Sequence, residues 1–259
     1  MDRLQSMYSV CTKGRSCFAM GRFTIPVKMT RHTVAIVQAR MGSTRFPQKM
    51  LAQLGGLPLL EWVFRRVLRA KCIDQVVLAT TDTSRDDPLV KLAGILGVAV
   101  CRGSEVHVLE RFIKAAAASK ATHVVRVCAD NPFIDPCEID RLVLHFFDHE
   151  FDYVCNHQDR LGSEYADGFG AEILSTATLR VIYKNAECPV DKEHVTSYLW
   201  ANQDRFKLGV IKAPSELRFP SLRFDVDRPV DLLNMQRLVD SGVMLESSAQ
   251  DIIRIANSD

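Results

Sequence analysis

The sequence lacks the features that define membrane-spanning, zinc-binding and nucleic-acid-binding proteins. Its apolar runs fall well short of the roughly 20 consecutive residues that a membrane helix needs, which excludes a membrane span. None of its eight cysteines lies at C-x-x-C spacing from another, so neither a zinc site nor a redox dithiol is indicated. A net charge of only +2, with 8% aromatic residues, gives no support for a nucleic acid as partner.

The cysteines that the chain does contain favour a reducing compartment. Cys101 and Cys128 each follow a run of apolar residues, as buried free thiols do. Because unpaired buried thiols are typical of proteins kept under reducing conditions, we expect a cytoplasmic location.

The small net charge conceals an uneven distribution along the chain. Residues 1–33 contain six basic side chains and one acidic side chain, so the remainder is net acidic. This first stretch has no helical or strand periodicity, and it lacks the apolar core of a secretory signal. Three alternatives are open: another kind of targeting peptide, a disordered extension, or a true start codon at Met20 or Met29. We therefore expect residues 1–33 to be separable from a domain at residues 34–259.

Strands and helices alternate regularly in the first half of that domain. Short apolar runs predict strands, and apolar residues at i, i+3, i+4 and i+7 predict helices between them. In the first helix, Arg65, Arg66 and Arg69 are expected to lie largely off the apolar stripe. Asp86 or Asp87 is expected to cap the second helix. The predicted strands are 34–37, 76–80, 98–101 and 123–128, and the predicted helices begin near Pro58, Asp87, Leu109 and Pro136.

Such alternation requires crossover connections between parallel neighbouring strands. The sequence therefore predicts an α/β fold in which a doubly wound, mainly parallel sheet lies between two layers of helices, a three-layer αβα sandwich. Beyond about residue 150 the alternation loosens. Two domain organisations are therefore possible: one domain with an inserted subregion, or two closely packed halves. The elements predicted there are strands at 152–155, 171–174, 207–211 and 222–226 and helices at 176–184, 191–201, 230–240 and 247–255.

The loop after the first predicted strand is rich in cations and small residues. Ligands of open α/β sheets bind beyond the carboxyl ends of the strands, which makes this loop a candidate site. Gly42 and Ser43 allow the backbone to approach a polyphosphate closely, and the side chains of Arg40, Arg45 and Lys49 would neutralise its charge. The loop lacks G-x-G-x-x-G and G-x-x-x-x-G-K-[ST], which argues against a dinucleotide dehydrogenase and a P-loop kinase. A solvated basic loop is the alternative.

Three aspartates follow or lie in later predicted strands and could hold a divalent cation. Asp130 comes soon after the strand at 123–128, where a cap or turn role is its alternative. Asp225 and Asp227 alternate along a predicted strand, so both cannot face one way if that strand is regular. We expect one of them to turn toward Asp130, because carboxylates beside phosphates are the usual setting of Mg²⁺. No cluster of histidine and cysteine supports zinc.

Several separated motifs together resemble those of one enzyme family. They are Gln-Ala-Arg-Met-Gly-Ser-Thr-Arg at 38–45, Leu-Ala-Thr-Thr-Asp at 78–82, Arg-Gly-Ser-Glu at 102–105, Val-Leu-Glu-Arg-Phe at 108–112, Asp-Asn-Pro-Phe-Ile-Asp-Pro at 130–136, Glu-His-Val-Thr at 193–196 and Asp-Val-Asp-Arg-Pro-Val-Asp-Leu at 225–232. Their order and spacing resemble those of the cytidylyltransferases that activate sugars as CMP derivatives. Within this family the chain is most similar to the spore coat polysaccharide biosynthesis proteins of the SpsF type, and the resemblance covers essentially residues 34–255.

The resemblance implies a Rossmann-like nucleotidyltransferase fold of the GT-A-like kind and a reaction of CTP with a sugar or sugar acid that yields a CMP-sugar and pyrophosphate. It further implies Mg²⁺ as cofactor, CTP and the acceptor sugar as partners, and a homodimer. The catalytic residues that it implies are Arg40, Arg45 and Lys49, and the metal ligands are Asp130 and Asp227 with Asp225 in support. The implied nucleotide-binding residues are Ala39, Arg40, Ser43, Lys49, Thr80, Thr81, Asp82, Ser104 and Arg126, and the implied acceptor-binding residues, mostly within a subregion at about 151–205, are Asp167, Glu172 and His194.

Three positions depart from the pattern of close relatives, which usually have leucine in place of Phe46 and glycine in place of Gln48 and Ala129. The turn at residues 47–49 is therefore expected to present Lys49 differently. None of the three changes removes a charged ligand, so we expect them to tune closure of the loop rather than to abolish activity.

Two other functions are open on the sequence alone. Asp225-Val226-Asp227 superficially matches the Asp-x-Asp metal motif of nucleotide-sugar-dependent glycosyltransferases, which share the sheet. A non-catalytic nucleotide-binding module is the second alternative, although Arg40, Lys49, Asp130 and Asp227 together argue against it. No pattern in the second half of the chain distinguishes one acceptor sugar from another.

Overall fold

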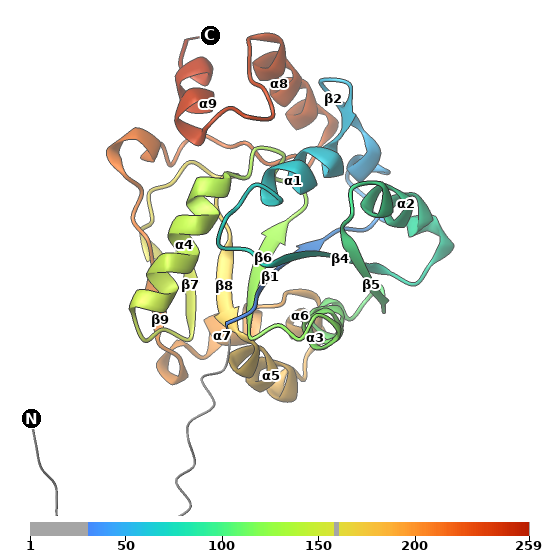
Figure 1. Cartoon of the computed structure of the whole chain (residues 1–259), viewed down its shortest axis with the longest axis vertical. Helices are drawn as coiled ribbons and strands as arrows, with labels where there is room; N and C mark the ends of the chain where they lie inside the picture. The colour runs from blue at the N-terminus through green and yellow to red at the C-terminus, as the bar shows by residue number, and fades with distance from the viewer. Residues whose placement is uncertain (1–30, 158–160, 259) are drawn as a thin grey trace, which may run out of the picture. The chain divides into compact units, whose positions relative to one another are not determined.

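A seven-stranded sheet lies at the centre of the computed structural model, which describes residues 31–157 and 161–258. Its strands are β1 (Thr33–Gln38), β4 (Gln75–Thr81), β5 (Ala99–Gly103), β6 (His123–Cys128), β7 (Tyr153–Cys155), β8 (Glu172–Ser175) and β9 (Leu208–Val210). They lie in the order β5-β4-β1-β6-β8-β7-β9 (Figure 1). All neighbours are parallel except that β8 runs antiparallel to both β6 and β7. A separate hairpin joins β2 (Gln53–Leu54) to β3 (Leu57–Pro58).

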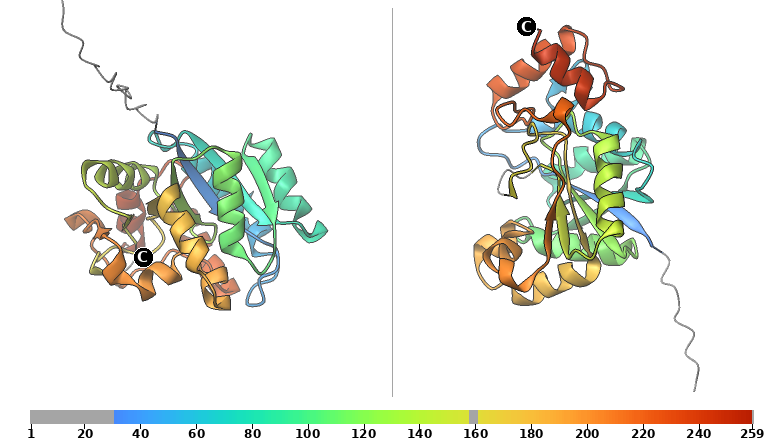
Figure 2. Two further views of the ribbon diagram at one scale, coloured as in Figure 1. Left: turned by 90° about the horizontal axis from the view of Figure 1, so that it is seen from below. Right: turned by 90° about the vertical axis from the view of Figure 1, so that its left-hand side faces the viewer.

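Helices cover both faces of this sheet (Figure 2). They are α1 (Leu59–Val67), α2 (Asp87–Ile95), α3 (Val108–Ala118), α4 (Pro136–Asp148), α5 (Thr176–Asn185), α6 (Pro189–Glu193), α7 (Ser197–Ala201), α8 (Pro229–Asp240) and α9 (Ala249–Ala256). Successive side chains of a strand point to opposite faces. Accordingly, Ala35 and Val37 pack in a buried cluster with α1, α2, α4, α8 and α9, whereas Val34 and Ile36 pack in a second cluster with α3, α5 and α7. The predicted three-layer, mainly parallel α/β architecture is confirmed.

The strand order creates a switch point between β1 and β6. From β1 the chain crosses over to β4 and then to β5 on one side, and it returns to β6 on the other side of β1. Where the direction of winding reverses in this way, the loops after the two central strands diverge and leave room for a ligand. The loop after β1, residues 39–49, and Asp130 after β6 therefore lie at the same edge of the sheet. We refer to residues 39–49 as the β1 loop.

Two predicted elements in the second half of the chain differ from the structure. The helix predicted at 191–201 is two short helices, because His194 between them has an extended backbone with φ −105° and ψ 100°. The segment 222–226 forms one isolated bridge instead of a strand. Its backbone bonds first to Asp167 and then to Asp130, which belong to different parts of the chain, so it follows no single neighbour far enough to extend a ladder.

Predictions on the chain's first residues and on its cysteines have mixed outcomes. The leader expected at residues 1–33 lies almost wholly outside the described residues, and β1 already begins at Thr33. In the described part of the chain, no disulfide joins the six cysteines. Cys137 and Cys188 are nevertheless exposed, because both lie at helix starts on the surface. In the described part of the chain, every helix is too short or too polar to cross a membrane.

Arg66 of α1 is buried, contrary to the expectation that it lies off the packed face of the helix. Its guanidinium donates to the carbonyl groups of Ile134 and Leu245, each at 2.7 Å, and lies 3.8 Å from the Asp135 carboxylate. Burial lowers the pKa of Arg66 to about 10, which still leaves the group charged at neutral pH. The helical periodicity missed this role because the covering segments come from distant parts of the sequence.

Replacing Arg66 with methionine is expected to lower the free energy of unfolding by about 3–5 kcal/mol, because Asp135 loses a buried cation and the buried carbonyl group of Ile134 loses its donor. Urea denaturation measures this loss. Arg65→Met is the matched control, since Arg65 is 46% exposed and pairs with Glu61 on the same helix, and it should cost less than about 1 kcal/mol. Equal losses in the two variants would contradict the role of Arg66.

Candidate active site

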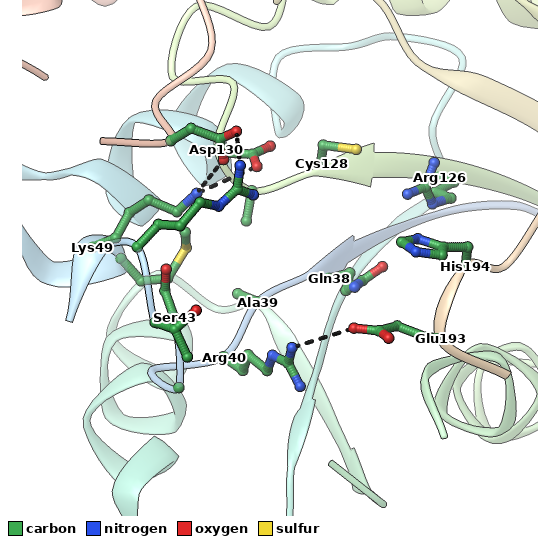
Figure 3. A pocket seen from close by; sticks show the side chains of 16 residues that line it. Gln38, Ala39, Arg40, Ser43, Lys49, Arg126, Cys128, Asp130, Glu193 and His194 are labelled. Atoms are coloured by element: carbon green, nitrogen blue, oxygen red, sulfur yellow. Dashed lines mark hydrogen bonds and ion pairs between the residues drawn. The ribbon is translucent and has the colours of Figure 1, made fainter. Parts of the chain in front are cut away.

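A cavity of about 430 Å³ opens at the switch point, beyond the carboxyl ends of β1 and β6 (Figure 3). The β1 loop forms one wall, the residues that end β6 form another, and the end of α6 closes one side. The lining residues are Gln38, Ala39, Arg40, Gly42, Ser43, Thr44, Arg45, Lys49, Met50, Arg126, Cys128, Ala129, Asp130, Glu193, His194 and Asp227. Position at a switch point and a lining that includes several charged side chains of both signs are both expected of a site for a charged ligand.

Lys49 joins three parts of the chain on one side of the cavity. Its side chain is only 9% exposed, and its Nζ donates to the carbonyl group of Val226 at 2.7 Å. The same nitrogen lies 3.4 Å from the Asp130 carboxylate and 3.5 Å from the Asp227 carboxylate. A hydrogen bond of 2.8 Å from the Val226 amide to the Asp130 carbonyl group holds the two carboxylate-bearing segments together. The lysine ammonium thus offsets the repulsion between two neighbouring carboxylates.

A second cation reaches the same cluster from solvent. Arg45 donates to Asp227 at 2.7 Å, yet 64% of its side chain is exposed. An exposed arginine can change partners at little cost, because surface ion pairs contribute at most about 1 kcal/mol. Arg45 can therefore leave Asp227 for an anionic ligand that enters the cavity.

The turn that delivers Lys49 adopts a conformation that favours glycine. Gln48, immediately before it, has φ 58° and ψ 20°, in the left-handed region. This conformation costs a residue with a side chain roughly 1–2 kcal/mol more than glycine. Glycine would adopt it without strain, whereas glutamine adopts it here with Lys49 still buried.

The β1 loop is fixed by Asp86, which the sequence analysis considered as a helix cap. Asp86 makes no side-chain cap bond to α2. Its Oδ1 instead accepts from the Met41 amide at 2.8 Å, and its Oδ2 accepts from the hydroxyl groups of Thr80 and Thr81 at 2.9 and 2.5 Å. Burial would raise the pKa of Asp86, but these hydrogen bonds outweigh it and lower the pKa, so the carboxylate stays ionised. A buried anion therefore holds the backbone at the start of the loop.

The side of the cavity near α6 contains a buried ion pair. Arg126 of β6 and Glu172 of β8 stand opposite each other in the antiparallel register and lie 2.9 Å apart. Burial would raise the pKa of Glu172, but the Arg126 cation outweighs it and lowers that pKa. Beside them, burial raises the pKa of Cys128 to about 12, so this thiol is protonated at neutral pH and is no nucleophile.

The end of α6 brings two further polar side chains to the cavity. Glu193 lies 3.7 Å from Arg40, and Figure 3 shows this pair, with His194 next to it. Glu193 ends α6, and His194 lies in the extended break before α7. Arg40 also donates to the carbonyl group of Glu105 at 3.3 Å, which links the β1 loop to the segment after β5.

The structure gathers most of the predicted site residues into this cavity and leaves others outside. Those in the cavity are Ala39, Arg40, Ser43, Arg45, Lys49, Arg126, Asp130, His194 and Asp227. Those outside it are Thr80 and Thr81, which bind Asp86, together with Asp82, Ser104, Asp167, Glu172 and Asp225. Gln38, Cys128 and Glu193 line the cavity although the prediction gave them no place in the site, and Asp86 was expected only as a helix cap. Gln38 and Glu193 stood in two of the recognised motifs, whereas nothing in the sequence pairs Asp86 with the β1 loop.

Asp225 and Asp227 have different surroundings, as their alternate positions in the sequence predicted. Asp225 accepts two hydrogen bonds from Arg223, at 3.0 and 2.8 Å. It lines a second cavity of about 340 Å³ and is absent from the lining of the first, which Asp227 shares with Asp130. Only Asp227 is placed to act together with Asp130.

The carboxylates of Asp130 and Asp227 fit one kind of metal ion. Among the described side chains, no group of three or more His, Cys, Asp or Glu is arranged to hold a metal. A fully protein-coordinated ion therefore does not fit the described part of the chain. Mg²⁺ usually binds one or two carboxylates and completes its shell with water and substrate phosphates, so this pair fits Mg²⁺ that arrives with a polyphosphate.

A doubly wound sheet with a cationic loop after its first strand and an aspartate pair at the switch point defines a nucleotidyltransferase-like fold and site. The cytidylyltransferase family matches residues 34–248, and the chain belongs to this family. The chain is 33% identical to the spore coat polysaccharide biosynthesis protein SpsF of Bacillus subtilis over 229 residues, which cover 86% of this chain and 92% of that protein.

Two further comparisons agree with this assignment. A 3-deoxy-manno-octulosonate cytidylyltransferase of Anaeromyxobacter dehalogenans is 38% identical over 115 residues, which cover 44% of this chain and 46% of that protein. The structure of a cytidylyltransferase from Leptospira borgpetersenii superposes with a TM-score of 0.82 at 26% identity and covers 88% of this chain and 95% of that one. The Rossmann-like nucleotidyltransferase fold expected from the motifs is confirmed.

Asp86→Asn is expected to lower the free energy of unfolding at pH 7 by about 1–3 kcal/mol, because a charged acceptor of several buried hydrogen bonds is lost. The folded-state pKa of Asp86 is lowered, so its stabilisation is present above the unfolded value of about 3.9 and is lost as the pH falls through the folded value. The difference between wild type and variant should therefore shrink below about pH 4. Urea titrations from pH 7 to 3 measure it.

Asp87→Asn is the matched control for this measurement. Asp87 is the next residue in the chain, 59% of its side chain is exposed, and it pairs with Arg102 at the surface. Its loss should change stability by less than about 1 kcal/mol. A difference between wild type and Asp86→Asn that stays constant down to pH 3 would contradict the assignment of an ionised Asp86.

Proposed function

We propose that the protein transfers CMP from CTP to a hydroxyl group of a sugar or sugar acid, with release of pyrophosphate, for the synthesis of a surface polysaccharide. The observation that carries this proposal is the cluster of Lys49, Asp130 and Asp227 at the switch point, with Arg45 at its edge. Membership of the cytidylyltransferase family supports CTP as the nucleotide. Two relatives, a spore coat polysaccharide biosynthesis protein and a 3-deoxy-manno-octulosonate cytidylyltransferase, support a sugar as acceptor.

The proposed reaction needs positioning and charge stabilisation without a covalent enzyme intermediate. The acceptor oxygen forms a bond to the α-phosphorus, its proton passes to solvent, and the bond from that phosphorus to the oxygen bridging to the β-phosphorus breaks. Pyrophosphate leaves with the electron pair and gains negative charge. Arg40, Arg45 and Lys49 would lie along the phosphates and stabilise that charge, while Ser43 and the backbone of the β1 loop would position the chain of phosphates.

Asp130 and Asp227 would hold Mg²⁺ in this proposal, with Asp225 at most in a supporting role. When bound, the ion would neutralise charge on the phosphate oxygens and make the α-phosphorus more open to attack. The protein's own part is to keep two carboxylates close together, which Lys49 does before any ligand enters.

The Asp-x-Asp reading of residues 225–227, which would favour a glycosyltransferase, has little support in the geometry. Asp225 is bound by Arg223 and lines a different cavity from the one that Asp130 and Asp227 share. A cytoplasmic location, a homodimer and a leader separable from residues 34–259 stay predictions.

Pyrophosphate release tests the proposal directly. Purified protein with CTP, Mg²⁺ and a panel of sugars and sugar acids should release pyrophosphate and form a CMP-sugar, both measurable by coupled assay and mass spectrometry. Consumption of a preformed sugar nucleotide without pyrophosphate would instead establish the glycosyltransferase alternative.

Lys49→Met is expected to lower kcat about 10²–10³-fold, because it removes a preorganised cation from the phosphates. Asp227→Asn should also lower turnover by at least about tenfold, and Asp225→Asn should lower it much less. Steady-state assays at saturating CTP measure these effects. Lys91→Met, on the exposed side of α2, is the control and should leave kcat unchanged. Full turnover by Asp227→Asn would overturn its assignment as metal ligand.

A further inference from the structure

An exposed ion pair packs directly against the β1 loop. Arg85, in the segment after β4, donates from Nη2 to Oε1 of Glu105, in the segment after β5, at 2.5 Å. A Cβ atom added to Gly42 of the loop would lie 2.8 Å from that oxygen and 2.9 Å from that nitrogen. Gly42 lines the cavity, and the two charged residues do not. The pair therefore contacts the loop beside the proposed phosphate site without lining the cavity itself.

The two segments that carry this pair are fixed by other arginines. Arg102 of β5 donates to the carbonyl groups of Thr81 and Thr83 at 2.8 and 2.6 Å, which ties the segment after β4 to β5. Arg111 of α3, which is fully buried, donates to the carbonyl group of Glu105 at 3.2 Å. The ion pair is thus attached to backbone whose position is set before any ligand binds.

Three successive residues of the β1 loop contact these two segments. The Arg40 side chain donates to the carbonyl group of Glu105 at 3.3 Å. The Met41 amide donates to Asp86 at 2.8 Å, and Gly42 contacts the ion pair. The part of the loop that would cradle the phosphates begins at this point, so its position depends on the segments after β4 and β5.

Gly42 does not have to be glycine for the sake of its backbone conformation. Its φ lies outside the left-handed region that favours glycine. The three atoms nearest to an added Cβ all belong to Arg85 and Glu105. The missing side chain therefore matches the space that the ion pair occupies, and the close approach of a phosphate is not needed to explain it.

We propose that Arg85 and Glu105 form a clamp that positions the β1 loop for the nucleotide, and that Gly42 lacks a side chain so that the clamp can close on it. This inference rests on the proposed function and adds two positioning residues to it. Loss of the clamp should raise the Kd for CTP about three- to fivefold, because an exposed ion pair contributes little free energy. Lys49 is anchored separately on Val226, so kcat at saturating CTP should change less than about twofold.

Three single variants with different changes of charge test the clamp. Arg85→Met removes a positive charge, Glu105→Gln removes a negative charge, and Gly42→Ala leaves the charge unaltered. Long-range electrostatics alone predicts that the anionic nucleotide binds more weakly to the first variant, more tightly to the second and equally well to the third. The clamp predicts weaker binding in all three. Calorimetry with CTP and Mg²⁺ measures the Kd, and steady-state pyrophosphate release separates KM from kcat.

The double variant Gly42→Ala with Arg85→Met separates the clamp from a direct phosphate contact. If the added methyl group acts by displacing the ion pair, the double variant should bind CTP as weakly as the weaker of the two single variants and no more weakly. If Gly42 instead serves the close approach of a phosphate, the two losses multiply. That result would overturn the inference.

Lys114→Met is the matched control. Lys114 forms an exposed ion pair with Glu110 at 2.9 Å within α3, and the variant makes the same change of charge as Arg85→Met. It should leave the Kd for CTP within about twofold of wild type. Urea denaturation tests for a general loss of stability, and the three clamp variants should unfold close to the wild-type midpoint.

The possible failures are distinguishable. Tighter CTP binding by Glu105→Gln, or unchanged binding by Gly42→Ala, overturns the inference and leaves the proposed function intact. A fall in the urea midpoint of Arg85→Met as large as that of Asp86→Asn also overturns it, because the pair would then act on the whole fold. Absence of CTP binding to the wild-type protein contradicts the proposed function itself.

Discussion

The site depends on one interaction, the burial of the Lys49 ammonium between the carboxylates of Asp130 and Asp227 and the carbonyl group of Val226. Two carboxylates that face one cavity repel each other, and a lysine with 9% exposure would be costly without anionic partners. The lysine therefore offsets the repulsion between the carboxylates, and the carboxylates offset the cost of burying the lysine. The interaction closes the β1 loop against the segment before α8, and it keeps two potential metal ligands together in the absence of ligand.

The rest of the fold serves to bring these groups to one edge of the sheet. Reversal of the winding between β1 and β6 places the β1 loop beside Asp130, and the backbone bond from Val226 to Asp130 carries Asp227 to the same point. Asp86 fixes the start of the β1 loop through a buried carboxylate. The cavity is thus built on buried charges whose partners are set before substrate binds.

The alternation of strands and helices up to α4 could be predicted because each element is determined by its own short periodicity. Buried charges could not, since their partners lie far away in the sequence: Arg66 meets Leu245, and Lys49 meets Asp227. The motif residues identified which charges matter, but the sequence did not indicate that Asp225 is held by Arg223. Similarly, nothing local indicates that the chain breaks at His194 and turns toward the cavity.

The binding of Mn²⁺, as a stand-in for Mg²⁺, tests the central claim that this cluster is a joint site for nucleotide and cation. In the free protein Lys49 and Arg45 occupy the two carboxylates, and a triphosphate would draw these cations away. Electron paramagnetic resonance should therefore show weak Mn²⁺ binding that strengthens at least about tenfold when an α,β-methylene analogue of CTP is added. Tight Mn²⁺ binding without nucleotide, or binding that the analogue leaves unchanged, would contradict the account.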